Sequence, residues 1–209
     1  MFNLIKALLK IALGLGVVLL IVAAALRVLF VDVAMVGHEG MAPTLVAGEY
    51  VAIWRKATAN VGDVLICEHP GEPNRHVMGR VLSKSGYKVR TDRFGQVVVG
   101  DETIQRDFRG ERRFFDTTRN EMVTMKYGIA KFGYYENEFF IEKGRKPTLR
   151  PTYVKRGVFL LGDNYTSVGN DSRYFGEVDP ETCVGQVFMI LWPAEDRGDD
   201  IRHLPLSLI

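Results

Sequence analysis

One long apolar run dominates the beginning of the chain. Ile11–Leu26 contains no charged or strongly polar residue, and the apolar character continues to Val31 with a single interruption. A helix of about 20 residues, at about 1.5 Å per residue, spans a hydrocarbon core of about 30 Å. Lys6 and Lys10 are the only charges before the run, so the positive-inside rule places the N-terminus in the cytoplasm. We therefore expect residues 1–32 to be a short cytoplasmic stub followed by a transmembrane signal-anchor.

This pattern also predicts the location of the protein. It favours a single-pass protein of the inner (cytoplasmic) membrane whose C-terminal domain is periplasmic or otherwise extracytoplasmic. Two other interpretations stay open at this point. Small residues at 23–25 would suit a cleaved secretory signal, and a buried core helix would also be apolar, although rarely over so long a run.

The apolar pattern changes after residue 32, where short runs of β-branched and aromatic residues alternate with turn signals such as Gly-Asp and Pro-Gly. No sustained helical period is present in this part of the chain. The pattern predicts a mainly β domain, barrel-like or sandwich-like, with long connections. The expected strands are Tyr50–Trp54, Val64–Cys67, His76–Leu82, Tyr87–Arg90, Gln96–Val99, Val158–Leu161 and Val184–Trp192.

One internal segment breaks the pattern. Residues 107–153 are rich in charges and aromatics and alternate only weakly, which favours an inserted subdomain. The β core then consists of residues 33–106 and 154–193, and residues 194–209 form a peripheral tail.

The amino-acid composition argues against a disordered, nucleic-acid-binding or metal-binding protein. Of the 209 residues, 47% are hydrophobic and 25% charged, which excludes disorder for most of the chain. A net charge of +2 gives no reason to expect a nucleic-acid partner. The two cysteines and four scattered histidines form no metal-binding pattern, so we expect no metal and no cofactor. Cys67 and Cys183 could pair outside the cytoplasm, but their spacing carries no signature, and pairing stays open.

Three separated segments carry a recognisable set of motifs. The first runs from Gly40 to Leu45 and contains Pro43, and the second is Val77–Val81, after a Gly-Asp turn. The third motif is the most specific, and its residues are Gly162, Asp163, Asn164, Asp171, Ser172 and Arg173. With the anchor before them, these segments resemble the signal peptidase I (leader peptidase) family over roughly residues 10–193.

The resemblance implies a membrane-anchored serine endopeptidase that uses a serine nucleophile and a neutral lysine as general base. At these two positions the chain has Gly40 and Gly79. The oxyanion-hole position, two residues before the nucleophile, is His38 instead of serine. The third motif is also one residue longer, which places Ser167 one position early. Because glycine can neither attack a carbonyl nor accept a proton, we expect a catalytically inactive member of the family.

An active enzyme with an unconventional catalytic arrangement remains the alternative. His76 precedes Gly79 by three residues, and alternation along a strand would point the two to opposite faces. A pair between Asp171 and Arg173 could brace the loop near the former site, or the third motif could be purely structural. The space left by the two glycines could admit larger side chains, or Met35, Met41 or Met78 could fill it.

Three functions follow as hypotheses. The first is binding without cleavage of an extended segment of an exported protein, or of a secretion, pilus or conjugation component, at a sheet edge near Gly40 and Gly79. The second is the unconventional endopeptidase. The third is a structural subunit with an aromatic interface on the insertion. In each case residues 11–31 would contact the lipid bilayer. The interface aromatics would be Phe114, Phe115, Tyr134, Tyr135, Phe139 and Phe140.

Overall fold

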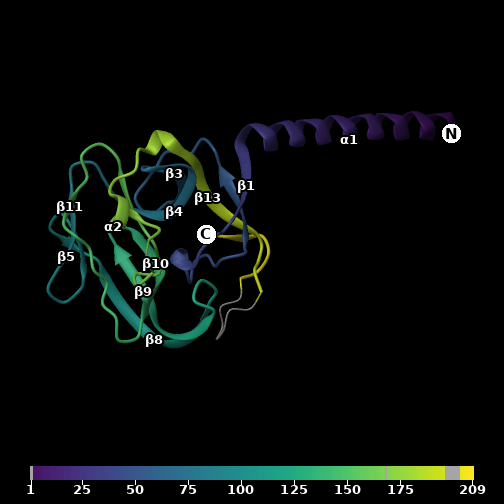
Figure 1. Cartoon of the computed structure of the whole chain (residues 1–209). Helices are drawn as coiled ribbons and strands as arrows, with labels where there is room; N and C mark the ends of the chain where they lie inside the picture. Colours follow the sequence, from purple (N-terminus) through teal and green to yellow (C-terminus); the bar gives the residue numbers. More distant parts are fainter. Residues whose placement is uncertain (1, 168, 196–202) are drawn as a thin grey trace.

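The computed structural model describes residues 2–167, 169–195 and 203–209. Among these residues one long helix, α1 (Phe2–Phe30), extends away from a β domain that contains the other described elements (Figure 1). Within α1, Lys10–Phe30 has a mean hydropathy of 2.6 and is not buried against the protein, as expected for a candidate membrane span. The predicted combination of an apolar N-terminal helix and a mainly β domain is confirmed.

The helix ends slightly earlier than predicted. Val31, which we expected in the membrane span, begins strand β1 (Val31–Met35), where it pairs with Trp54. Strand pairing starts here because the backbone of Phe30 already bonds to the next strand: its carbonyl accepts the N–H of Arg55 at 2.9 Å. The rings of Phe30 and Trp54 stack with centroids 5.5 Å apart. The helix is therefore joined to the sheet without a flexible linker.

The main sheet has the strand order β1-β2-β13-β3-β4-β12, with β14 also paired to β13. All of its pairings are antiparallel, and it contains five of the seven strands expected from the sequence. A disulfide between Cys67 and Cys183 joins the neighbouring strands β3 and β13. The further strand bounds are β2 (Tyr50–Trp54), β3 (Val64–His69), β4 (Glu72–Lys84), β12 (Val158–Leu161), β13 (Cys183–Trp192) and β14 (Ser207–Leu208).

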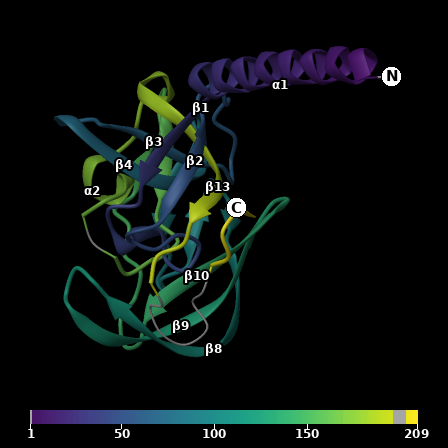
Figure 2. The ribbon, with the colours of Figure 1, turned by 90° about the vertical axis from the view of Figure 1, so that its right-hand side faces the viewer.

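Two smaller sheets complete the domain. One is the three-stranded meander of β8 (Gln105–Asp116), β9 (Glu121–Phe132) and β10 (Tyr135–Glu142). It lies at the end of the domain away from α1 (Figure 2). The other has the order β11-β5-β6-β7. Its strands are β5 (Lys88–Thr91), β6 (Val97–Val99), β7 (Glu102–Thr103) and β11 (Thr152–Tyr153).

The aromatic residues of the insertion are mostly interior, which contradicts the hypothesis that all six form an interface. Phe114, Phe139 and Phe140 are fully buried, and Phe114 and Phe140 pack edge to face. Large apolar side chains spaced along long strands bury themselves against the rest of the domain because burial removes their surface from water. Of the six, Tyr134 and Tyr135 are exposed, at the β9–β10 turn.

Three short helical turns connect the strands near the motifs: η1 (Glu39–Met41), α2 (Ser172–Phe175) and η2 (Pro180–Thr182). The described part of the tail returns to the domain, because β14 pairs with β13. Residues 196–202 of the predicted tail lie outside the described residues.

Candidate functional site

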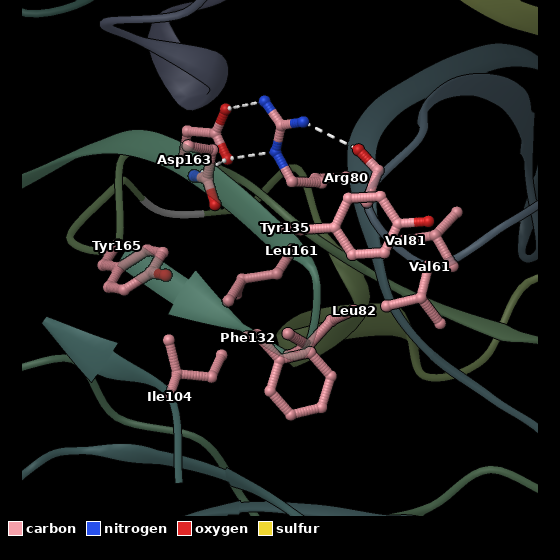
Figure 3. A pocket seen from close by; sticks show the side chains of 12 residues that line it. Val61, Arg80, Val81, Leu82, Ile104, Phe132, Tyr135, Leu161, Asp163 and Tyr165 are labelled. Atoms are coloured by element: carbon pink, nitrogen blue, oxygen red, sulfur yellow. Dashed lines mark hydrogen bonds and ion pairs between the residues drawn. The ribbon is translucent and has the colours of Figure 1, made fainter. Parts of the chain in front are cut away.

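One ion pair joins the three motifs. The guanidinium of Arg80 donates to both carboxylate oxygens of Asp163, at 2.9 and 2.7 Å, and to the carbonyl of Gly62 at 2.7 Å (Figure 3). Asp163 also accepts hydrogen bonds from Thr44 at 2.6 Å and from Asn137 at 2.9 Å. A bidentate pair of this kind fixes both orientation and distance. It therefore holds the first, second and third motifs, and the sheet of β8, β9 and β10, in one arrangement.

A small cavity of about 30 Å³ lies beside this ion pair, roughly the volume of one water molecule (Figure 3). The ring of Tyr135 covers Gly62 so closely that a Cβ at this glycine would lie 2.1 Å from a ring carbon. The buried Tyr165 lies on the far side of the cavity, and burial raises the pKa of its phenol. The cavity is too small for a peptide, so we assign it a structural role.

Gly40, which stands at the predicted nucleophile position, is buried in η1 and bonded on both sides. Its N–H donates to Nδ1 of His38 at 3.0 Å, and its carbonyl accepts the N–H of Asn164 at 3.0 Å. A Cβ on Gly40 would lie only 2.7 Å from that same Nδ1. The imidazole therefore fills the space that a side chain at position 40 would need. Its Nδ1 also accepts the hydrogen bond of the Gly40 N–H, which is then not available to a ligand.

Gly162, the first glycine of the third motif, lies against the backbone of Gly40. A Cβ on Gly162 would lie 2.3 Å from the carbonyl oxygen of Gly40. Only glycine allows the two backbones to approach so closely. The first and third motifs are thus in direct backbone contact at the candidate site.

Gly79, at the predicted general-base position, has no room for a side chain, because Leu160 of the neighbouring strand packs against it. A Cβ on Gly79 would lie 2.8 Å from the Cβ of Leu160 on β12. Ser172 helps to hold this strand, because its hydroxyl accepts the N–H of Leu160 at 2.9 Å. The space is therefore not filled by Met35, Met41 or Met78, as one hypothesis had it. Met35 is exposed, and the other two pack in a separate core cluster.

The environment of His38 keeps its imidazole neutral. Burial lowers the pKa of His38; the nearby Asp171 opposes this shift and Arg75 reinforces it. Nδ1 accepts a hydrogen bond from Gly40, so in the neutral ring the proton is on Nε2. The structure gives Nε2 no hydrogen-bond partner within the described ranges. It is a donor that faces the surrounding space.

A trough of about 400 Å³ is bordered by this histidine. Asp32–Met35 of β1 line one side, His76–Met78 of β4 line the other, and the floor consists of Ile53, Ile66 and Val184. β1 pairs only with β2, and β4 pairs with β12 only from Arg80 onward, so among the described strands both sides of the trough are unpaired edges. Such edges bind extended peptides through main-chain hydrogen bonds.

A second, polar pocket of about 130 Å³ lies on the other side of His38. His38 lines both spaces. Ser167 lines the polar pocket, and its hydroxyl oxygen lies 3.7 Å from the position of a Cβ on Gly40. Other lining residues come from the meander: Asp116, Thr118, Arg119, Met125 and Glu142.

The pair predicted between Asp171 and Arg173 is present. Arg173 Nη2 lies 2.7 Å from the carboxylate of Asp171, and both side chains are buried. Arg173 also donates to the carbonyl of Ser167 at 2.7 Å, while Asp171 accepts the N–H of Gly162 at 3.1 Å. Through these bonds the pair shapes the loop that holds Ser167 beside Gly40.

The described residues contain no cluster of three or more His, Cys, Asp or Glu side chains that could hold a metal ion. Glu39 is buried next to Gly40, but both of its carboxylate oxygens accept hydrogen bonds, from Thr117 at 2.5 Å and from the backbone of Ala47 at 3.0 Å.

An apolar N-terminal helix that is a candidate membrane span, a β domain beyond it and an edge-lined trough beside three linked motifs define a peptidase-like protein. The family model described as signal peptidase, peptidase S26, matches residues 8–192, and the chain belongs to this family. It is 24% identical to a signal peptidase I of Pseudomonas fluorescens over 217 aligned positions, which cover 89% of the chain and 72% of that protein. It is 22% identical to a signal peptidase I of Streptococcus pneumoniae serotype 4, with 88% and 94% covered.

The structure brings His38, Gly40 and Asn164 of the predicted site together through hydrogen bonds, with Asp163 next to Asn164 in the chain. The sequence did not predict the contact between Leu160 and the space beside Gly79. The sequence carried no signal for that contact, because it depends on the register between β4 and β12, which shifts at Leu160. Arg80 was visible within the second motif, but its partner lies 83 residues away.

Proposed function

We propose that the protein is a non-catalytic member of the signal peptidase family that binds an extended segment of an exported protein without cutting it. The residues at and around the two catalytic positions of the family carry this proposal. Gly40 and Gly79 have no side-chain functional group. His38 accepts the Gly40 N–H, and Leu160 fills the space beside Gly79.

The trough supports the binding part of this proposal. The trough between β1 and β4 keeps two free strand edges and an apolar floor, as a β-strand ligand requires. Family membership implies preproteins as ligands, and the apolar α1 supports a position at the membrane where exported chains emerge. Components of secretion, pilus or conjugation machinery are the partners we propose, with the inner membrane as the location and the β domain on its extracytoplasmic side.

A cleavage and binding assay on the full-length protein tests the proposal. We expect a labelled preprotein to bind and to remain intact during prolonged incubation. His76→Arg and Val33→Arg, which place charge on the two sides of the trough at positions that are not buried, should abolish binding, while Arg90→Glu on β5, outside the residues that line the trough, should not. Binding that survives both trough substitutions would contradict the proposal.

One observation favours a second candidate function, an unconventional serine endopeptidase. The Ser167 hydroxyl and the His38 imidazole both lie within 4 Å of the position that a Cβ on Gly40 would take. A hydroxyl and a neutral imidazole near one point are the elements of a nucleophile and its base. In the observed arrangement, however, Nδ1 is occupied by Gly40 N–H, so the imidazole would have to rotate before it could act as a base.

Two single substitutions decide between the candidates. If the preprotein is cleaved, and if Ser167→Ala and His38→Ala each abolish cleavage while binding persists, the endopeptidase is correct and the non-catalytic proposal is wrong. If no cleavage occurs with the unmodified protein, the dyad is excluded.

A further inference from the structure

We propose that the trough recognises a free peptide carboxylate at His38, with Arg75 of β4 close enough to act on that imidazole. This inference rests on the proposed function, because it names the chemical group that the peptide-binding site selects. The preferred ligand would then be a peptide that ends in the trough, such as a fragment already released by another peptidase, and an intact chain would bind less tightly.

The first argument is steric. The imidazole of His38 stands over Gly40, with ring atoms 2.7 and 2.9 Å from the position of a Cβ at that residue. It borders both the apolar trough and the polar pocket beyond it. A peptide that lies along β1 and β4 therefore meets a wall at this point, and a chain that ends there fits more easily than one that continues.

The second argument concerns hydrogen-bond donors. The neutral His38 presents its Nε2–H, and the described residues supply no acceptor for it. An unused donor on the residue that borders the trough suits a group with several acceptor lone pairs, which a carboxylate provides.

The third argument is charge. Arg75, on β4, donates to the side chain of Asn170 at 3.0 Å, and Asn170 belongs to the same loop as Ser167. The guanidinium thus connects β4 to this loop beside His38, and its charge contributes to the lowered pKa of that imidazole. Two of its N–H donors are used, one by Asn170 and one by Glu72 at 2.7 Å, which leaves others of its five free.

The neighbouring acids do not cancel this charge. Asp171 is fully engaged with Arg173, and the pair of Glu72 with Arg75 is exposed to solvent, where such pairs are weak. A ligand carboxylate can therefore compete for Arg75. The charged and titratable groups around His38 and the trough are Asp171 and Arg173 beside α2; Arg75, Glu72 and His76 on β4; Glu39 on η1; Asp32 on β1; and, across the polar pocket, Asp116, Arg119, Glu142 and Arg145.

The experiment compares three forms of one peptide on the full-length protein in detergent micelles. The probe is an N-terminally labelled peptide of about eight Ala and Val residues, because the trough floor is apolar. It is made as the free acid, as the C-terminal amide, and with about six further residues at its C-terminus. We expect the free acid to bind about tenfold more tightly than either other form, a typical size for a charge-assisted contact.

Substitutions assign that preference to the two side chains. Arg75→Gln should remove the preference for the acid and leave the affinity for the amide unchanged. His38→Asn should reduce the preference, since asparagine still caps the Gly40 N–H but lacks the imidazole. Arg55→Gln is the matched control: Arg55 is similarly exposed and pairs with Asp32 on the side of β1, so the preference should persist.

The pH dependence gives an independent measure. A bound carboxylate stabilises the protonated imidazole, so the preference for the acid should grow as the pH falls from about 7.5 to about 5.5. Equal affinities for the acid, the amide and the extended peptide would overturn the inference and leave the proposed function standing. An equal loss of acid and amide binding in Arg75→Gln would also overturn it, because the arginine would then only support the fold. Failure of all three forms to bind would contradict the proposed function itself.

Discussion

The Cβ of Leu160 lies 2.8 Å from the position that a side chain on Gly79 would have to occupy. Leu160 and Gly79 are on neighbouring strands, β12 and β4, whose pairing shifts register at Leu160. The packing of Leu160 therefore fills the place that a side chain at position 79 would need.

This contact predicts different costs for side chains at the two glycines. Gly79→Ala should destabilise the protein by about 1–3 kcal/mol, since the added Cβ meets another Cβ and nearby backbone that cannot move away. Gly40→Ala should cost clearly less, because the group it meets is the movable ring of His38. Urea unfolding of both variants measures the difference, and equal costs would contradict the observed packing.

The same contacts predict what a Ser–Lys pair at positions 40 and 79 would need in order to cleave a preprotein. Gly40→Ser with Gly79→Lys should remain inactive toward a preprotein, because His38 and Leu160 occupy the new side chains' places. Adding His38→Ser and Leu160→Gly removes both obstacles and should give detectable cleavage. A peptidase assay on both combinations checks this. Activity in the double variant would show that the strands separate easily at Gly79.

The ion pair between Arg80 and Asp163 predicts a large loss of stability when one partner is removed. Asp163→Asn should cost about 3–5 kcal/mol, because a largely buried guanidinium loses its counter-charge. Asp116→Asn is a suitable control, since it also removes a carboxylate paired with an arginine, in that case the more exposed Arg119. Its cost should stay near 1 kcal/mol or below. Denaturant unfolding followed by tryptophan fluorescence compares the two, and similar costs would contradict the structural role of Asp163.

The disulfide predicts a redox-dependent stability. Cys67 and Cys183 are 116 residues apart, so their bond restricts the unfolded chain strongly, and its loss should cost about 2–5 kcal/mol. Thermal unfolding with and without a reductant measures this effect. The double variant Cys67→Ala, Cys183→Ala should match the reduced protein and should not respond to the reductant. An unchanged melting temperature on reduction would show that the bond does not form.

The contact between His203 in the C-terminal tail and Glu49 should depend on pH. Nδ1 of His203 lies 2.6 Å from the buried carboxylate of Glu49. Burial alone would lower the pKa of His203, but the hydrogen bond and charge of Glu49 outweigh it and raise the pKa above 6.5. The contact therefore contributes full stability below about pH 6.5 and loses it as the pH rises through the raised value.

Hydrogen exchange at the β14 amides measures the attachment of the tail. We expect faster opening at alkaline pH, beyond the intrinsic increase in exchange rate, and loss of this excess in His203→Gln. His76→Gln, which changes a histidine away from the tail, should behave like the unmodified protein. A pH-independent opening of β14 would contradict a charged contact between His203 and Glu49.

Local pattern was sufficient for most of the architecture. Tyr50–Trp54 and Val158–Leu161 were predicted to the residue, because short β-branched runs between turn signals have few other ways to bury their side chains. The long strands β8, β9 and β10 were recognised only as an insertion. In these strands the charged residues lie outside because Phe114 and Phe139 are buried inside. The sequence does not show which of the weakly alternating positions point inward.

By itself, the sequence determined that an apolar helix precedes a β domain of the signal peptidase type, and that glycines stand where a nucleophile and a base are expected. These are properties of residue identity and order. Only the tertiary structure decided that His38 bonds to Gly40, that Leu160 closes over Gly79, and that two free strand edges border one trough. Each of these depends on strand register and side-chain packing between segments far apart in the chain, for which local sequence contains no physical constraint.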